Sequence, residues 1–240
     1  MTQSDAPGTT GTNPGAGKRS LFEKLWSDHV VTELGEGAAL IAVDRILLHE
    51  RTGAIALREL NAAGRPILDP ARVFCTMDHI VDTQPGRSDA TTVPGGEALI
   101  TETRARATAG GIRLFDVRDP EQGIVHVMSP ELGIVLPGVT LVCPDSHTCT
   151  QGALGAFAWG IGTTEAEHAL ATGTLRVRKP KSMRVIFDGR LGPGVTAKDL
   201  SLALIGGHSS AGGNGHVVEF HGSAVRHLDI EGRLALFNMG

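Results

Sequence analysis

The sequence predicts an α/β protein, with a large domain up to about residue 180 and a smaller α/β segment after a hinge at Lys179–Lys181. Short apolar runs alternate with segments of helical spacing, the pattern of strands joined by helices. Glycine accounts for 32 of the 240 residues, well above the average share, so tight turns and close backbone contacts are expected. Apolar residues make up 41% of the chain, enough for a substantial core.

The first helix is expected to follow a stretch that has almost nothing to bury. Residues 1–19 are mostly small or polar, and we expect a disordered tail because ordering them would cost backbone entropy without burying apolar surface. Ser20 then stands three residues before Glu23, which is the arrangement of a capping box. This pair predicts a helix from Ser20 to about His29.

The next elements lead to a first pair of acidic and imidazole side chains. Residues 39–48 form a nearly continuous apolar run, which predicts one strand buried on both faces. Residues 52–63 have helical spacing, and residues 73–77 form a short strand that ends at Asp78 and His79. Ligands bind at the carboxyl ends of strands in open α/β sheets, so this pair occupies a candidate site.

Two further apolar runs place histidines in a similar way. Residues 123–128 have the composition of a strand that carries His126, and residues 138–143 predict a strand whose end presents Asp145 and His147. The same periodicities predict the remaining elements. These are helices at 96–109, 163–175 and 198–205, and strands at 112–117, 183–189 and 217–221.

Charge and hydropathy exclude several classes of protein. The 22 basic and 26 acidic residues are mixed along the chain, so no basic block suits nucleic acid. No apolar run reaches the roughly 18 residues of a membrane span, and the N-terminus lacks the pattern of an export signal, so we expect a cytoplasmic protein without membrane association. The cysteines form neither a disulfide framework nor a complete zinc or iron–sulfur ligand set. They are Cys75, Cys143 and Cys149.

The acidic and imidazole pairs suggest proton transfer. Asp78 precedes His79 directly, and Asp145 lies two residues before His147. A carboxylate that accepts from one imidazole nitrogen fixes the tautomer and raises the imidazole pKa, so the ring can deliver a proton near neutral pH. An elimination or hydration needs such a donor because the leaving hydroxyl must be protonated, and the assistance is worth roughly 10²–10⁴ in rate.

The same residues allow other interpretations. Each aspartate is also typical of a turn or cap, and His126 of a hydrogen-bonded core histidine. Ser146 as a hydrolase nucleophile lacks the Gly-x-Ser-x-Gly context, and zinc held by His79, His126 and His147 lacks a zinc-site spacing. The glycine-rich residues 206–215 lack a phosphate-loop lysine, which favours a closely packed or flexible loop.

Taken together, eight segments resemble the aconitase superfamily, and within it the large subunits of 3-isopropylmalate dehydratases. They occur in the order expected of that family. The resemblance is to the N-terminal half of these large subunits, and it covers nearly all of residues 20–240. The segments are Asp78–His79, Gly123–His126, Leu136–Gly138, Asp145–Thr148, Gly160–Thr163 with Glu165 and His168, Pro193–Asp199, Gly212–His216 with Val218–Phe220, and Asn238–Gly240.

The resemblance implies an aconitase-like three-layer α/β/α domain at 20–180 and the start of a second, smaller α/β domain at 181–240, truncated at its end. It also implies a hydro-lyase that isomerises 2-isopropylmalate to 3-isopropylmalate in leucine biosynthesis, by removing and returning water. Such enzymes use a [4Fe-4S] cluster held by three cysteines, whose open iron acts as a Lewis acid.

The family also implies roles for the matched residues. Asp78 and His79 resemble the pair that protonates the leaving hydroxyl. The residues that resemble the set hydrogen-bonded to the iron-bound water or hydroxyl are His126, Asp145 and His147. Ser146 resembles a contact to a substrate carboxylate, and Asn238 a residue that lines the cluster pocket.

Several family parts are expected to lie on other polypeptides. In the family, the cluster cysteines follow the region that corresponds to residue 240, and the base that removes the carbon-bound proton comes from a small dehydratase subunit. We therefore expect two partners, a small dehydratase subunit and a chain that supplies the cluster cysteines. The expected substrate is a small hydroxy acid. Ile55 stands where relatives commonly carry a glutamine, and Phe237 where they often have cysteine. Two alternatives therefore stay open: a truncated non-catalytic relative, or a hydro-lyase on another alkylmalate.

Overall fold

The computed structural model describes residues 19–240, so the predicted tail lies outside the described residues except for Arg19. The predicted α/β class is confirmed. A five-stranded sheet has the strand order β5-β4-β3-β6-β7, and every neighbouring pair is parallel. Its strands are β3 (Arg45–His49), β4 (Val73–Thr76), β5 (Arg113–Phe115), β6 (Thr140–Cys143) and β7 (Phe157–Gly160).

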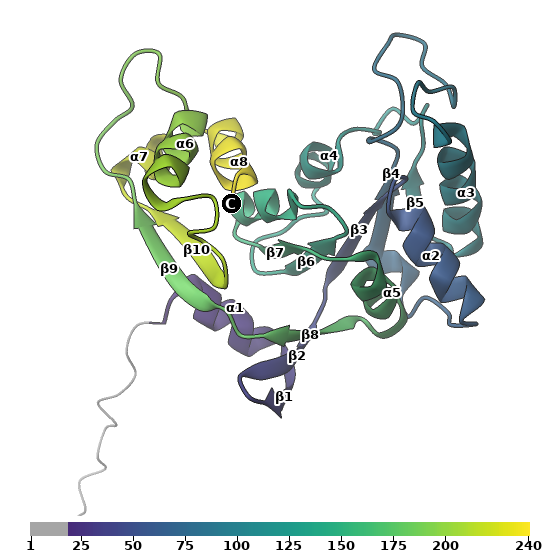
Figure 1. Cartoon of the computed structure of the whole chain (residues 1–240), viewed down its shortest axis with the longest axis horizontal. Helices are drawn as coiled ribbons and strands as arrows, with labels where there is room; N and C mark the ends of the chain where they lie inside the picture. Colours follow the sequence, from purple (N-terminus) through teal and green to yellow (C-terminus); the bar gives the residue numbers. More distant parts are fainter. Residues whose placement is uncertain (1–18) are drawn as a thin grey trace, which may run out of the picture.

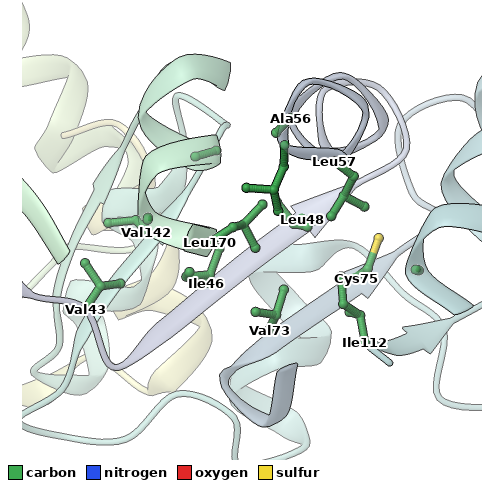
Figure 2. Close-up of a cluster of buried hydrophobic side chains, with 14 of the residues drawn as sticks. Val43, Ile46, Leu48, Ala56, Leu57, Val73, Cys75, Ile112, Val142 and Leu170 are labelled. Atoms are coloured by element: carbon green, nitrogen blue, oxygen red, sulfur yellow. The ribbon is translucent and has the colours of Figure 1, made fainter. Parts of the chain in front are cut away.

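Helices cover both faces of this sheet, which gives three layers (Figure 1). On one face lie α2 (Gly53–Ala62), α3 (Gly96–Ala109) and α5 (Thr163–Thr172), and on the other lies α4 (Val125–Glu131). Side chains alternate between the faces along each strand. Ile46 and Leu48 pack with α2 and α5, as Figure 2 shows, whereas Leu47 packs with α4.

The predicted strand at 39–48 is two strands in two different sheets. β2 (Ala38–Ala42) pairs antiparallel with β1 (Val30–Gly35) and β8 (Thr174–Arg178), whereas β3 enters the parallel sheet. The break falls at Asp44, whose carboxylate accepts from the Thr140 N–H at 2.9 Å and lies 2.8 Å from the His29 ring. These bonds turn the chain between the sheets, so the prediction of a single strand was wrong.

The predicted strand at 123–128 is also wrong, because this segment begins helix α4. The Val125 N–H at the start of α4 donates to Asp78 Oδ2 at 2.7 Å. A carboxylate at this end satisfies a free backbone donor and interacts favourably with the helix dipole. A contact from a residue 47 positions earlier, which periodicity cannot register, thus stabilises the helix.

Most other elements match their predictions. Helix α1 (Leu21–His29) has the predicted capping box, with reciprocal bonds between Ser20 and Glu23. Helix α5 ends at Thr172 rather than 175, because Gly173 adopts a left-handed conformation with φ 64° and the chain continues into β8.

The last segment forms a small unit beside the large sheet (Figure 1). Its parallel strands β9 (Lys181–Ile186) and β10 (His216–His221) are joined through α6 (Ala197–His208). The other elements are the short α7 (Ser223–His227), α8 (Ile230–Asn238), and two 3-10 helices in the large unit, η1 (Pro70–Arg72) and η2 (Thr148–Leu154). Helix α8 packs against η2, so Phe237 contacts Gly152 closely.

Candidate active site

The candidate site lies where the carboxyl ends of β3, β4 and β6 meet. The chain runs outward from β3 through β4 to β5, and then crosses back to place β6 on the other side of β3. The crevice at such a reversal of strand order is the usual ligand site of open α/β sheets. The side chains that follow these three strands converge on one carboxylate, Asp145.

Asp145 accepts hydrogen bonds from three parts of the chain. Its Oδ1 lies 2.7 Å from His126 Nε2 and 2.7 Å from the backbone nitrogen of His147, and its Oδ2 lies 3.0 Å from His79 Nε2. The bond from His126, followed by that from His79, holds the pKa of the Asp145 carboxyl well below its usual range. Asp145 is therefore ionised, and both imidazoles donate to it.

The Asp145 loop is supported from behind by β7. Gly160 pairs with Cys143 at the end of β6, and a Cβ at residue 160 would overlap the backbone carbonyl of Asp145. Only glycine leaves room for this approach, so β7 fixes the position from which the Asp145 side chain projects.

His79 lies between two carboxylates. Its Nε2 faces Asp145, and its Nδ1 lies 2.6 Å from Asp78 Oδ1. Both ring nitrogens therefore donate, which requires the imidazolium form. The bond to Asp145 and then the bond to Asp78 raise the pKa of His79 to about 10. Its side chain stays 27% exposed, so this charged ring is accessible to a ligand.

Asp78 connects this pair to the other face of the sheet. Its side chain is 2% exposed, and one oxygen bonds His79 while the other accepts from the Val125 N–H of α4. The next residue of α4 is His126, so the carboxylate that orients His79 also helps to place the second imidazole. Asp78, His79, His126 and Asp145 thus form one continuous network.

Glu50 is a supporting residue that was not predicted from the sequence. Fully buried after β3, its carboxylate accepts from the backbone nitrogens of Asp78 at 2.9 Å, of His79 at 2.7 Å, and also of Ile80. Burial raises the pKa of Glu50, and these backbone donors oppose that shift. The side chain fixes the backbone that carries the Asp78–His79 pair.

His49 is the second missed residue. Its ring stacks on that of His79, with centroids 3.7 Å apart and an angle of 12° between the planes. Burial, and then the charge of His79, lower the pKa of His49 to about 4, so the ring is neutral near pH 7. His49 and Glu50 directly follow an apolar run, the same signal that identified Asp78 and His79, and that signal could have found them.

The remaining predicted residues lie at the edge of the network. The backbone nitrogen of His147 bonds Asp145, whereas its ring Nδ1 donates to the Asn238 carbonyl oxygen at 3.0 Å. The Asn238 side-chain amide donates to Thr150 at 2.9 Å. Ser146 is exposed and lines an apolar cleft of about 430 Å³ together with Cys149. The structure therefore brings His147 and Asn238 together, and leaves Ser146 open to a ligand.

The donor atoms of the described residues suit proton transfer better than metal binding. His49, Glu50, Asp78 and His79 offer atoms within 4.8 Å of one another. However, the Glu50 oxygens accept backbone N–H groups, and both nitrogens of His79 carry protons toward carboxylates, so these lone pairs are not free.

The cysteines do not form a cluster-binding set within the described part of the chain. Cys75 and Cys143 are buried in separate packing clusters of the sheet, and burial raises the pKa of both thiols. Cys149 lies in η2, with Sγ 3.3 Å from the Phe237 carbonyl oxygen. Thiolates bind iron, and buried thiols in separate places do not fit a [4Fe-4S] cluster.

Stability should fall as the pH rises through the range in which His79 loses its proton. The folded pKa of about 10 exceeds the ordinary 6.5, so this contribution is complete below about pH 6.5 and is lost as the pH approaches 10. We expect the free energy of unfolding, measured with urea, to decrease across this interval. In His79→Gln this decrease should be smaller, whereas the exposed-site control His168→Gln should show the same decrease as the wild type. Equal slopes of unfolding free energy against pH in all three proteins would contradict the assignment.

Comparisons with known proteins agree with the resemblance seen in the motifs. The aconitase family, described as aconitate hydratase, matches residues 23–240. A protein of Bradyrhizobium diazoefficiens, 3-isopropylmalate dehydratase large subunit 1, is 50% identical over 221 residues. That match covers 92% of this chain and 46% of the relative, so the chain spans about half the length of the curated relative it matches.

The described helices include none that is both long and apolar enough to cross a bilayer. The family match extends from α1 to the end of α8 and includes every residue of the network around Asp145. On the strength of that match, the chain belongs to the aconitase family.

Proposed function

We propose that the chain is a component of a hydro-lyase that isomerises 2-isopropylmalate to 3-isopropylmalate by dehydration and rehydration, in the cytoplasm and in leucine biosynthesis. The observation that carries this proposal is the position of His79 between the carboxylates of Asp78 and Asp145, which lie 2.6 Å and 3.0 Å from its two ring nitrogens and favour the protonated ring. Loss of a hydroxyl from a 2-hydroxy acid requires a proton, and His79 is a charged, partly exposed proton donor.

The other residues support the same chemistry. Asp145 stabilises the imidazolium of His79 and orients His126, while Asp78 fixes the opposite nitrogen of His79. Ser146 is exposed beside the network, in a position to hydrogen-bond a substrate carboxylate. His147 donates through Nδ1, which leaves Nε2 as an acceptor or proton carrier toward a ligand.

Two parts of the reaction are assigned to groups outside residues 19–240. The cysteines of residues 19–240 do not fit the iron–sulfur cluster that the family uses, so we infer that its cysteine ligands come from polypeptide outside these residues. The relative is named as a large subunit, which supports a small dehydratase subunit as a partner that supplies the base for the carbon-bound proton.

The proposal is tested by isolating the tagged chain with its partners from its native host. We expect the complex to contain iron and sulfide and to interconvert 2-isopropylmalate and 3-isopropylmalate. Other 2-alkylmalates, assayed in parallel, test whether a chain with Ile55, in place of the common glutamine, acts on a different substrate. A folded, partner-bound chain without iron or turnover on any alkylmalate would favour a non-catalytic relative instead.

Within that complex, His147→Ala should reduce kcat by roughly 10² or more, the usual contribution of a positioned proton-transfer group. The folded state should change little, because the His147 side chain is exposed and its backbone N–H to Asp145 remains. The measurement compares turnover and urea unfolding with those of the exposed control His227→Ala. Unchanged turnover would remove His147 from the catalytic set.

A further inference from the structure

Gln151 is a fully buried amide beside His126, and the proposed reaction assigns it no role. It lies in η2, and its side-chain nitrogen is 3.2 Å from the His126 carbonyl oxygen and 3.2 Å from Ser129 Oγ. The same nitrogen is 3.5 Å from His126 Nδ1. One side chain therefore contacts both the backbone and the ring of a single site residue.

The neighbours of this amide determine which end faces His126. The His126 carbonyl oxygen only accepts, and the Ser129 hydroxyl already donates to the Val125 carbonyl oxygen, so its lone pairs face Gln151. Reversing the amide would place its oxygen against both acceptors. The hydrogen-bond network thus directs the NH₂ group of Gln151 toward His126 Nδ1.

The other side of the His126 ring is fixed by Asp145. Nε2 lies 2.7 Å from Asp145 Oδ1, an ionised acceptor, so Nε2 carries a proton. Asp145 is the charged group that contacts this ring among the described residues. The Gln151 NH₂ group has two hydrogens and faces the His126 carbonyl oxygen, Ser129 Oγ and His126 Nδ1. A hydrogen shared with Nδ1 favours a lone pair on that nitrogen, and an imidazole with one proton is neutral.

We propose that Gln151 is a positioning residue that holds His126 as the neutral tautomer with its proton on Nε2. Asp145 then faces one imidazolium, His79, and one neutral donor, His126. This division leaves His79 as the carrier of the transferable proton. Its catalytic meaning rests on the proposed function, but the protonation state can be measured without turnover, so each can fail separately.

The first test needs no substitution at residue 151. Long-range ¹H–¹⁵N correlation spectra of the full chain with ¹⁵N-labelled histidine, at neutral pH, report the state of each ring nitrogen. We expect His126 to show a protonated Nε2 and a non-protonated Nδ1, and loss of these signals in His126→Asn identifies them. A doubly protonated His126 in the wild-type chain would overturn the inference.

Variants of Gln151 test whether this amide is the cause. Gln151→Met has a similar length without a donor, so the preference of His126 for a proton on Nε2 and a lone pair on Nδ1 should weaken, and the two ring-nitrogen signals should change. Gln151→Glu places a carboxylate at Nδ1, and His126 should become doubly protonated at neutral pH. Gln84→Glu adds the same charge at an exposed site and should leave His126 unchanged. Ring-nitrogen signals of His126 that are the same in Gln151→Met and in the wild type would overturn the inference.

Discussion

Asp145→Asn is expected to reduce turnover of the partner-bound enzyme by at least roughly 10²–10⁴, the range for a lost proton-transfer group. Asparagine keeps the size of the side chain but removes its charge. His79 then loses the partner that contributes most to its pKa of about 10, and that pKa should fall toward its ordinary value. The proton donor and the orientation of His126 are affected by one substitution.

Two measurements separate this effect from simple misfolding. The pH dependence of the His79 ring resonances reports its pKa directly, and turnover is measured on the same preparation. Asp28→Asn, which makes the same change at an exposed site in α1, should alter neither quantity. If Asp145→Asn leaves both the His79 titration and the turnover as in the wild type, Asp145 is not the centre of the network.

Glu50→Ala is expected to cause the largest loss of stability among the site substitutions. It would remove a fully buried acceptor and leave the backbone donors of Asp78, His79 and Ile80, the last of them buried, without their partner. Each unsatisfied buried donor costs roughly 1–3 kcal/mol, so a loss of about 3 kcal/mol or more in the free energy of unfolding is expected. Glu50→Gln keeps one acceptor oxygen and should lose less.

Urea denaturation of the purified chain provides the comparison. Glu59→Ala is a suitable control, because Glu59 belongs to the adjacent helix α2 and its side chain is 57% exposed. The expected order of destabilisation is Glu50→Ala, then Glu50→Gln, then Glu59→Ala. An equal effect of Glu50→Ala and Glu59→Ala would mean that the Glu50 carboxylate does not support the Asp78–His79 backbone.

The strand ends were predictable from local sequence, and their geometry was not. Asp78, His79 and Asp145 follow short apolar runs, and parallel strands bring such ends to one edge of a sheet. His49 and Glu50 carry the same signal, but the run before them was read as one long strand. The break at Asp44 depends on its bonds to His29 and Thr140, which are remote in sequence.

Helix α4 illustrates the same limit. The residues around His126 are apolar enough for a strand, and a seven-residue helix that contains Pro130 leaves little helical periodicity. The bond from Val125 to Asp78 stabilises its first turn, and it joins residues 47 positions apart. Sequence alone therefore identified His126 as a candidate but assigned it to the wrong element.

The sequence by itself determined the α/β class, the family, and most of the residues now found around Asp145, because apolar periodicity and ordered motifs are local properties. Only the tertiary structure decided how protons are distributed among these residues. His79 carries a charge because Asp145, 66 positions away, lies 3.0 Å from its Nε2, whereas His49 is neutral because it is buried against that charge. Protonation depends on distance and burial, and both are set only when the strands assemble into one sheet.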